Sequence, residues 1–135
     1  MGIKMILNVD GASRGNPGPA AIGITLRDEN KKIIDTISDR IGETTNNQAE
    51  YRALISGLKK AVSLGARQVL VNSDSELMVK QLNGLYRVKK EELKPLHAEV
   101  KKLAASLESF KIVSIARERN READRLANQA FERTY

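Results

Sequence analysis

Cysteine and tryptophan are both absent from this chain, and histidine occurs once. Without cysteine the protein can form no disulfide, no thiolate metal site and no cysteine nucleophile, and a zinc site is therefore disfavoured. The first residues contain no charged stretch followed by an apolar segment, and no apolar run approaches the roughly 20 residues that span a bilayer. We therefore expect a cytoplasmic protein that binds no membrane, and no obligatory protein partner is evident.

The remaining composition is that of a folded, basic protein. Charged residues make up 30% of the 135 positions and hydrophobic residues 41%, as in ordinary globular domains. This length fits one domain with a single core, which we expect to span residues 1–135. The net charge of +6 favours a polyanionic partner such as nucleic acid, although many basic proteins bind none.

The first third of the sequence predicts antiparallel strands. Apolar residues alternate along 3–9, which is typical of a central strand, and a turn rich in glycine and proline follows at 10–19. Further strands are predicted at 20–27 and 32–41, separated by the polar DENK of a hairpin turn.

The rest of the sequence predicts helices that alternate with strands. Thr45 and Gln48 have the spacing of a capping box, and apolar residues then repeat at three and four positions as far as Gly65, which places Glu50 in the first turn of a helix. Later elements are a strand at 69–74, a helix at 75–83, a helix from Pro95, a strand at 110–116 and a helix capped by Asn120. We expect an α/β fold with a mixed sheet and helices on its faces.

Four acidic residues stand at the ends of these predicted elements. Asp10 and Asp74 end strands, while Glu50 and Asp124 lie in first turns of helices. Taken singly, each has a structural explanation, as a turn residue or as an acid near the positive end of a helix dipole. If the two strands are parallel neighbours, however, Asp10 and Asp74 lie side by side at the sheet edge where α/β proteins build their sites.

Four neighbouring carboxylates repel one another, and either protonation or cation binding relieves the repulsion. Oxygen ligands suit Mg²⁺ or Mn²⁺. Two such ions about 4 Å apart can hold both the attacking water and the leaving oxygen of a phosphodiester. The sequence therefore predicts a two-metal site for phosphodiester hydrolysis.

Four segments resemble ribonuclease H type 1 in order and spacing: DGASRGNPGPA (10–20), TTNNQAEYRALISGL (44–58), NSDSELMVKQLNG (72–84) and EADRLANQA (122–130). Together they span essentially the whole chain. The resemblance implies the ribonuclease H-like fold, in which a five-stranded mixed sheet with its first three strands antiparallel is flanked by helices. It also implies endonucleolytic cleavage of the RNA strand of RNA/DNA hybrids, with two Mg²⁺ ions, replaceable by Mn²⁺, and with 5′-phosphate and 3′-hydroxyl ends as products.

The resemblance further assigns roles to individual residues. The family's catalytic and metal-binding acids match Asp10, Glu50, Asp74 and Asp124. Asp10 would bridge both metal ions, and Glu50 would also touch a ribose 2′-hydroxyl, the group that distinguishes RNA from DNA. Asn16, Asn46 and Asn47 match positions that line the hybrid's minor groove, and Thr45 matches one that holds a DNA phosphate. We also expect Gly11, Ser13 and Arg117 to contact the substrate. For the amides among them, turn formation and helix capping are an equally good explanation.

Two departures from the family pattern concern loops. Many members carry a histidine shortly before the last acid, whereas this chain has the short ARERNRE at 116–122. His97 lies too early to replace it, and we predict a surface or boundary position for that residue. We expect Arg119 to bind the scissile phosphate or stabilise leaving-group charge, since arginine stays protonated, although a solvated loop remains the alternative.

The second departure is the missing basic, tryptophan-bearing protrusion of some relatives. Here the corresponding segment is YRVKKEELK at 86–94, whose basic residues either meet DNA phosphates or form a solvated face. Two other functions stay open, a non-catalytic nucleic-acid-binding module and another nuclease of the same fold. The presence of all four acids argues against the first, and the Asn46–Asn47 pair beside Glu50 argues against the second.

Overall fold

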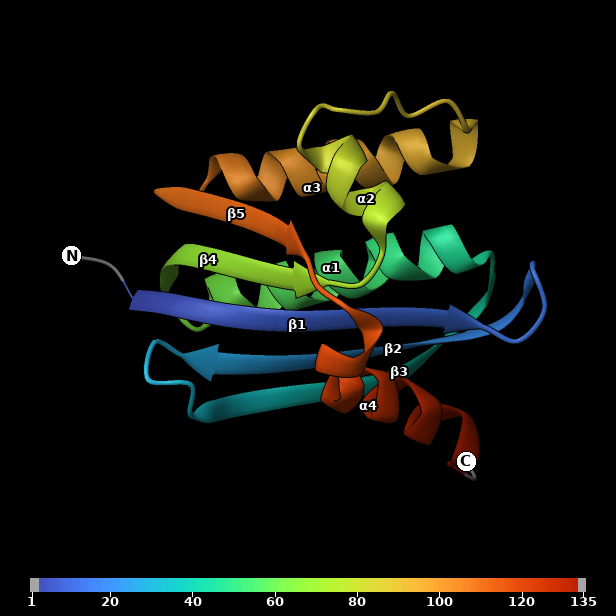
Figure 1. Cartoon of the computed structure of the whole chain (residues 1–135), viewed down its shortest axis with the longest axis horizontal. Coiled ribbons are helices and arrows are strands. Elements are labelled where there is room, and N and C mark those ends of the chain that lie inside the picture. Colours follow the sequence, from blue (N-terminus) through green and yellow to red (C-terminus); the bar gives the residue numbers. More distant parts are fainter. Residues whose placement is uncertain (1–2, 134–135) are drawn as a thin grey trace.

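The computed structural model describes residues 3–133 and confirms the predicted α/β architecture. Among these residues, five strands form one mixed sheet in the order β3-β2-β1-β4-β5 (Figure 1). The strands β1 (Ile3–Ser13), β2 (Gly18–Asp28) and β3 (Ile33–Thr44) are antiparallel neighbours, as predicted. The strands β4 (Ala66–Ser73) and β5 (Ser109–Ser114) run parallel to β1, which is therefore the central strand.

Helices cover both faces of this sheet (Figure 1). Within residues 3–133 the α-helices are α1 (Asn46–Ser63), α2 (Glu76–Leu82), α3 (Lys94–Ala105) and α4 (Arg121–Glu132). Two short 3-10 turns, η1 (Glu91–Leu93) and η2 (Arg117–Arg119), precede α3 and α4. None of the helices in this range combines the length and apolar character needed to cross a membrane.

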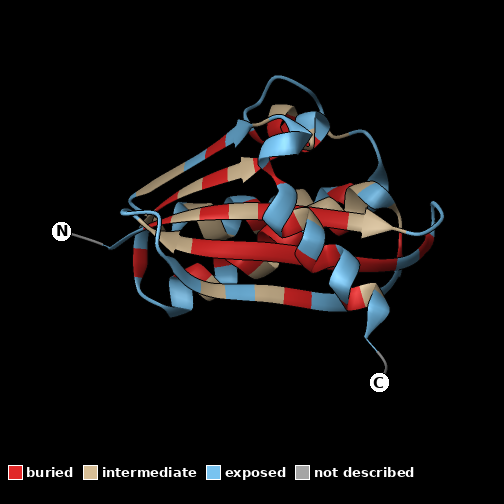
Figure 2. Ribbon diagram, turned by 60° about the horizontal axis from the view of Figure 1, so that its bottom comes forward, coloured by how far each residue is buried: buried red, intermediate tan, exposed pale blue. Residues whose placement is uncertain are grey.

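The main core lies between the sheet and α1. The strand β2 is buried from residue 20 to residue 26, the long red segment of Figure 2. Leu7 and Val9 of β1 and Leu54 and Leu58 of α1 are all fully buried in the same apolar cluster. Burying a side chain of this size contributes about 1.5–3 kcal/mol, so this layer supplies much of the free energy that holds the sheet against the helix.

Two glycines allow helices to approach the sheet at the positions that matter for the candidate site. A Cβ on Gly11 would lie 2.2 Å from the carbonyl carbon of Ala49, so the start of α1 packs directly on the backbone of β1. A Cβ on Gly23 would lie 2.1 Å from the carbonyl oxygen of Ala123, so α4 packs as closely on β2 from the other face. Only glycine permits such backbone contacts.

Several predicted boundaries are confirmed and two are wrong. The capping box is present, since the Thr45 hydroxyl accepts from the Gln48 amide and the Gln48 side chain accepts from the Thr45 amide. The helix begins at Asn46, however, so Glu50 lies in the second turn and the first-turn prediction is wrong. The first strand also does not end at Asp10, because its ladder with β2 continues as far as the pair Ser13 and Ala20.

Candidate active site

Three carboxylates from three different elements meet at one edge of the sheet. Asp10 lies on β1, Glu50 on α1 and Asp74 immediately after β4, and one oxygen of each lies within 4.8 Å of the others. Asp10 is buried, at 7% exposure, while Glu50 and Asp74 are partly exposed. These positions lie 24 to 64 residues apart along the chain, so only the fold brings them together.

The register of the sheet places Asp10 beside Asp74. In the parallel ladder of β1 and β4, Val9 is the partner of Ser73, so the next residue of each strand is an aspartate. Glu50 reaches the same place from α1, and its Oε1 accepts a 2.7 Å hydrogen bond from the main-chain N–H of Gly11. The backbone contact between Gly11 and Ala49 makes this reach possible.

Asp124 lies next to this cluster but is not one of its three members. It lines the same pocket of about 450 Å³, together with Asp10, Glu50 and Asp74. Asp10 faces Gly23 across the ladder, and Gly23 contacts α4 next to Asp124. The Asp124 side chain is a hydrogen-bond partner of Asp10, and its charge adds to the negative potential there. All four predicted acids thus border one pocket.

The electrostatics of the cluster disfavour three simultaneous negative charges. Burial, together with the charges of Asp74 and Asp124, raises the pKa of Asp10 from 3.8 to about 8. Burial, followed by the charge of Asp10, holds the pKa of Glu50 well above its usual range, and the Gly11 hydrogen bond only partly opposes this. Burial also raises the pKa of Asp74, against the lowering effect of its hydrogen bond with Asn120. Carboxylates in this state are stabilised as anions by a bound cation.

The donor set fits a hard divalent cation. Asp10, Glu50 and Asp74 offer only carboxylate oxygens, and no histidine or cysteine among residues 3–133 joins the cluster. Mg²⁺ and Mn²⁺ prefer such ligands, whereas zinc and copper favour nitrogen and sulfur. The chemistry of these side chains therefore supports a magnesium or manganese site.

The other residues predicted to contact substrate fall into two groups. Gly11, Ser13, Asn46, Asn47 and Arg117 line the carboxylate pocket. The two remaining predicted contacts have structural tasks, since Thr45 caps α1 and Asn16 accepts a 3.0 Å hydrogen bond from the Asn46 amide.

Part of the first group also holds the backbone in place. The Asn46 side chain accepts a 2.8 Å hydrogen bond from the Ser13 amide, and the Ser13 hydroxyl contacts the carbonyl oxygens of Gly15 and Thr44. These bonds fix the β1–β2 turn against the start of α1. The capping and turn explanation of the amides is therefore observed, while contact with a substrate stays a prediction.

The arginines of η2 point to different places. Arg117 lines the carboxylate pocket, and its positive charge opposes the raised pKa values of Asp10, Glu50 and Asp74. Arg119 instead lines a separate polar pocket of about 210 Å³ that includes Thr25 and Arg27. Its predicted contact with the scissile phosphate stays a prediction, and Arg117 is the arginine that shares the pocket with the acids. His97 is half-buried on α3, with Nε2 3.4 Å from the Gln81 carbonyl oxygen, as expected for a boundary residue.

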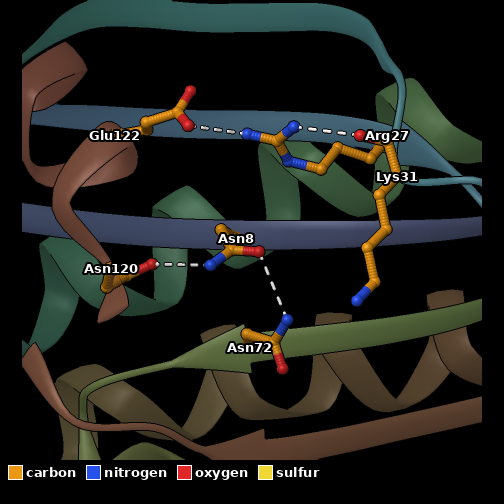
Figure 3. A network of polar contacts seen from close by, with 6 residues as sticks. All are labelled: Asn8, Arg27, Lys31, Asn72, Asn120 and Glu122. Atoms are coloured by element: carbon orange, nitrogen blue, oxygen red, sulfur yellow. Dashed lines mark hydrogen bonds and ion pairs between the residues drawn. The ribbon is translucent and has the colours of Figure 1, made fainter. Parts of the chain in front are cut away.

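Sequence reasoning missed three asparagines directly behind the acids. Asn8, Asn72 and Asn120 form a hydrogen-bonded chain, and Asn120 is only 1% exposed (Figure 3). Asn8 and Asn72 each precede a predicted acid by two positions in a strand, which puts amide and acid on the same face. This spacing was the feature of the sequence that could have revealed them.

A second pocket adjoins the carboxylate pocket. It has a volume of about 490 Å³ and shares Asn47 with the first. Its lining combines Leu77, Leu85 and Tyr86, all exposed by more than a third, with the cationic side chains of Arg87, Lys89 and Lys90. The predicted basic segment therefore borders a pocket beside the candidate site. Arg87, Lys89 and Lys90 are exposed, so their contact with DNA phosphates stays a prediction.

Comparisons with known proteins agree with this geometry. A family model described as reverse transcriptase-like matches residues 8–130. The bifunctional protein Rv2228c of Mycobacterium tuberculosis is 40% identical over 131 residues, which cover 96% of this chain and 36% of that protein. Ribonuclease HI of Halobacterium salinarum is 40% identical over 123 residues, or 91% of this chain and 62% of that protein. The chain thus spans between about a third and two thirds of the length of these relatives.

Solved structures show the same likeness in three dimensions. The crystal structure of RNase H1 from Halobacterium salinarum has a TM-score of 0.93 and 38% identity, over 96% of this chain and 98% of that one. LC11-RNase H1, solved in complex with an RNA/DNA hybrid, has a TM-score of 0.90 and 41% identity, over 95% of this chain and 96% of that one. The similarity therefore covers nearly every described element.

Proposed function

Because this chain belongs to the ribonuclease H type 1 family, we propose that it is a metal-dependent endoribonuclease acting on RNA/DNA hybrids. It would hydrolyse the RNA strand and leave 5′-phosphate and 3′-hydroxyl ends. The observation that carries this proposal is the meeting of Asp10, Glu50 and Asp74 within 4.8 Å, in the lining of a pocket of about 450 Å³.

Asp10, Glu50 and Asp74, with Asp124 beside them, are the residues that would hold two Mg²⁺ ions. When bound, such ions supply an activated water and stabilise charge on the leaving oxygen of a phosphodiester. The protein's own contribution is to keep the carboxylates close before any cation arrives. Burial of Asp10 and the hydrogen bond from Gly11 to Glu50 hold two of them in place, so little rearrangement is needed on binding.

Arg117 has the second role in this proposal. Its side chain lines the same pocket as the acids and brings a positive charge to it. A fixed positive charge there can bind a non-bridging oxygen of the scissile phosphate and stabilise the charge that develops during cleavage. We assign to Arg117 the electrostatic role that the sequence alone suggested for Arg119.

In this proposal the DNA strand of the hybrid lies along the adjoining pocket. Arg87, Lys89 and Lys90 stand next to the candidate site and can neutralise phosphates without reading base sequence. The exposed ring of Tyr86 and the leucines beside it offer an apolar surface to sugars. Glu50, which lines the carboxylate pocket, is the residue that we propose to test for contact with a ribose 2′-hydroxyl of the RNA strand.

A direct assay separates this function from its alternatives. The protein is incubated with Mg²⁺ or Mn²⁺ and with end-labelled RNA/DNA hybrid, RNA duplex or DNA duplex, beside an Asp10→Asn variant. We expect internal cuts in the RNA of the hybrid only, 5′-phosphate on the products and no cuts by the variant. Hybrid binding without cleavage would indicate a non-catalytic module, and cleavage of the DNA duplex would indicate another nuclease of this fold.

A further inference from the structure

A layer of three amide side chains lies next to Asp10, Asp74 and Asp124. The amides come from the same parts of the chain as these acids, namely β1, β4 and the start of α4. Asn8 precedes Asp10 by two residues on β1, and Asn72 precedes Asp74 by two residues on β4. Residues two apart in a strand point to the same face, and Asn8 and Asn72 are partners in the parallel ladder. The third amide, Asn120, stands at the start of α4, the helix that carries Asp124.

These amides form one directed chain of hydrogen bonds (Figure 3). Nδ2 of Asn72 donates to Oδ1 of Asn8 over 3.2 Å, and Nδ2 of Asn8 donates to Oδ1 of Asn120 over 3.1 Å. Nδ2 of Asn120 then donates to the carbonyl oxygen of Val9 over 2.9 Å. The chain therefore links β4 to β1, β1 to α4, and α4 back to the residue just before Asp10.

The orientation of Asn120 depends on this chain. An asparagine at the N-cap of a helix ordinarily accepts from an amide of the first turn, yet here the side chain makes no capping bond. Its oxygen instead meets the donor of Asn8, so a flipped amide would set two donors against each other. The main-chain carbonyl oxygen of Asn120 also accepts a 3.1 Å hydrogen bond from the Asp124 amide, so Asp124 is linked to Asn120 as well.

We propose that Asn8, Asn72 and Asn120 form a positioning network that sets the spacing of Asp10, Asp74 and Asp124 for cation binding. Asn120 is buried, and Asn8 and Asn72 are half-buried. Polar side chains that hydrogen-bond one another in this way specify one arrangement, whereas aliphatic side chains in the same place would pack in several. The network acts through the backbone of β1, through the start of α4 and through the side chain of Asn120. Its consequence for catalysis rests on the proposed function, while its consequence for cation binding does not.

A hydrogen bond between the Asn120 side chain and the Asp74 carboxylate supports this inference, because it joins the network directly to one of the acids. Asn120 thus makes a hydrogen bond at each of three acids: to the carbonyl oxygen of Val9 just before Asp10, to the Asp74 carboxylate, and from the Asp124 amide. Glu50 is outside the network, since Gly11 holds it separately.

The test breaks the chain at its middle and measures cation binding directly. Asn8→Leu keeps the approximate size of the side chain but removes both of its hydrogen bonds. We expect it to weaken Mn²⁺ binding, measured by calorimetry on the protein without nucleic acid, by about tenfold, the lower end for loss of a group that orients metal ligands. On the hybrid it should lower kcat by a similar factor and leave KM within about twofold.

Two further variants keep the test decisive. Asn83→Leu removes a single hydrogen bond, to the Ile112 carbonyl, outside the network and should leave Mn²⁺ affinity unchanged. Asn72→Ala removes only the first donor of the chain and should weaken Mn²⁺ binding by about threefold even if Asn8→Leu does not fold. The double variant Asn8→Leu/Asn72→Ala should bind Mn²⁺ no more weakly than Asn8→Leu alone, because Asn8→Leu already removes the hydrogen bond between the two residues.

A purely structural role would appear as lower Tm with unchanged Mn²⁺ affinity in both Asn8→Leu and Asn72→Ala, and this result would overturn the proposal. If the wild-type protein binds Mn²⁺ but cleaves no hybrid, the proposed function fails while the calorimetry still decides the role of the network.

Discussion

The main-chain N–H of Gly11 donates a 2.7 Å hydrogen bond to Oε1 of Glu50, and this contact joins the central strand β1 to α1 beside the carboxylate cluster. It exists because Gly11 has no Cβ, which would otherwise lie 2.2 Å from the carbonyl carbon of Ala49. The position of Glu50 on α1 therefore depends on the presence of glycine at position 11 of β1.

Gly11→Ala tests this dependence. The added methyl group must push α1 away from β1, so we expect a loss of at least about 2 kcal/mol in the free energy of unfolding and weaker Mg²⁺ binding. Urea unfolding and calorimetry measure the two effects. Gly42→Ala is the control, since its Cβ would meet nothing within 4 Å and its positive φ of 83° costs about 1 kcal/mol of strain only. Equal Mg²⁺ affinity in both variants would contradict the account.

Asp10 predicts an unusual dependence of stability on pH in the cation-free protein. Its pKa is raised from 3.8 to about 8 in the folded state, so between these values the folded protein binds more protons than the unfolded chain. Stability should then fall as pH rises from 4 to 8, by at least about 1.4 kcal/mol, the equivalent of one pKa unit. Thermal unfolding in the presence of a chelator measures this.

The matching control for that pH profile is Asp10→Asn. The variant cannot ionise at this position, so its stability should fall less between pH 4 and pH 8, and at pH 8 it should exceed the wild type in the absence of cations. Added Mg²⁺ should raise the Tm of the wild type more at pH 8 than at pH 5, because a bound cation favours the charged carboxylates. A flat wild-type profile would contradict the raised pKa.

Arg117→Ala should separate cation binding from catalysis. Its positive charge opposes the entry of a cation, so its loss should tighten Mg²⁺ binding slightly while it lowers kcat by about a hundredfold, as for removal of one charge-stabilising donor. Arg119→Ala, from the neighbouring pocket, should change kcat by less than about threefold. Steady-state kinetics on the hybrid and calorimetry provide the readouts. A larger effect at Arg119 would restore the assignment made from sequence.

Lys89→Ala combined with Lys90→Ala should raise KM on the hybrid and flatten its salt dependence. Each lost phosphate contact lowers the slope of log affinity against log salt by about 0.9. Fluorescence anisotropy with a catalytically inactive Asp10→Asn background gives the slope without cleavage. Lys32→Ala, on the exposed β2–β3 turn, is the control for a general loss of charge. If the slope of log affinity against log salt is the same in all variants, the basic residues of the pocket beside Asn47 do not contact phosphates.

Local patterns explain why much of the fold was predictable. The capping box of Thr45 and Gln48, the alternation before Asp10 and the residue types of the first hairpin all act over a few residues, and each is found in the structure. The second-turn position of Glu50 was not predicted. Thr45 is the N-cap and the helix begins at Asn46, so Glu50 is its fifth residue and follows the first turn.

The sequence by itself determined which side chains were available: carboxylates but no thiolates, one histidine far from the last acid, and more basic than acidic residues. It also determined the order of strands and helices. Only the tertiary structure decided which groups meet. It placed Arg117 and not Arg119 with the acids, and it aligned Asn8, Asn72 and Asn120 into one chain. The physical reason is that strand register and helix docking join residues up to 112 positions apart, and no local pattern encodes a contact of that range.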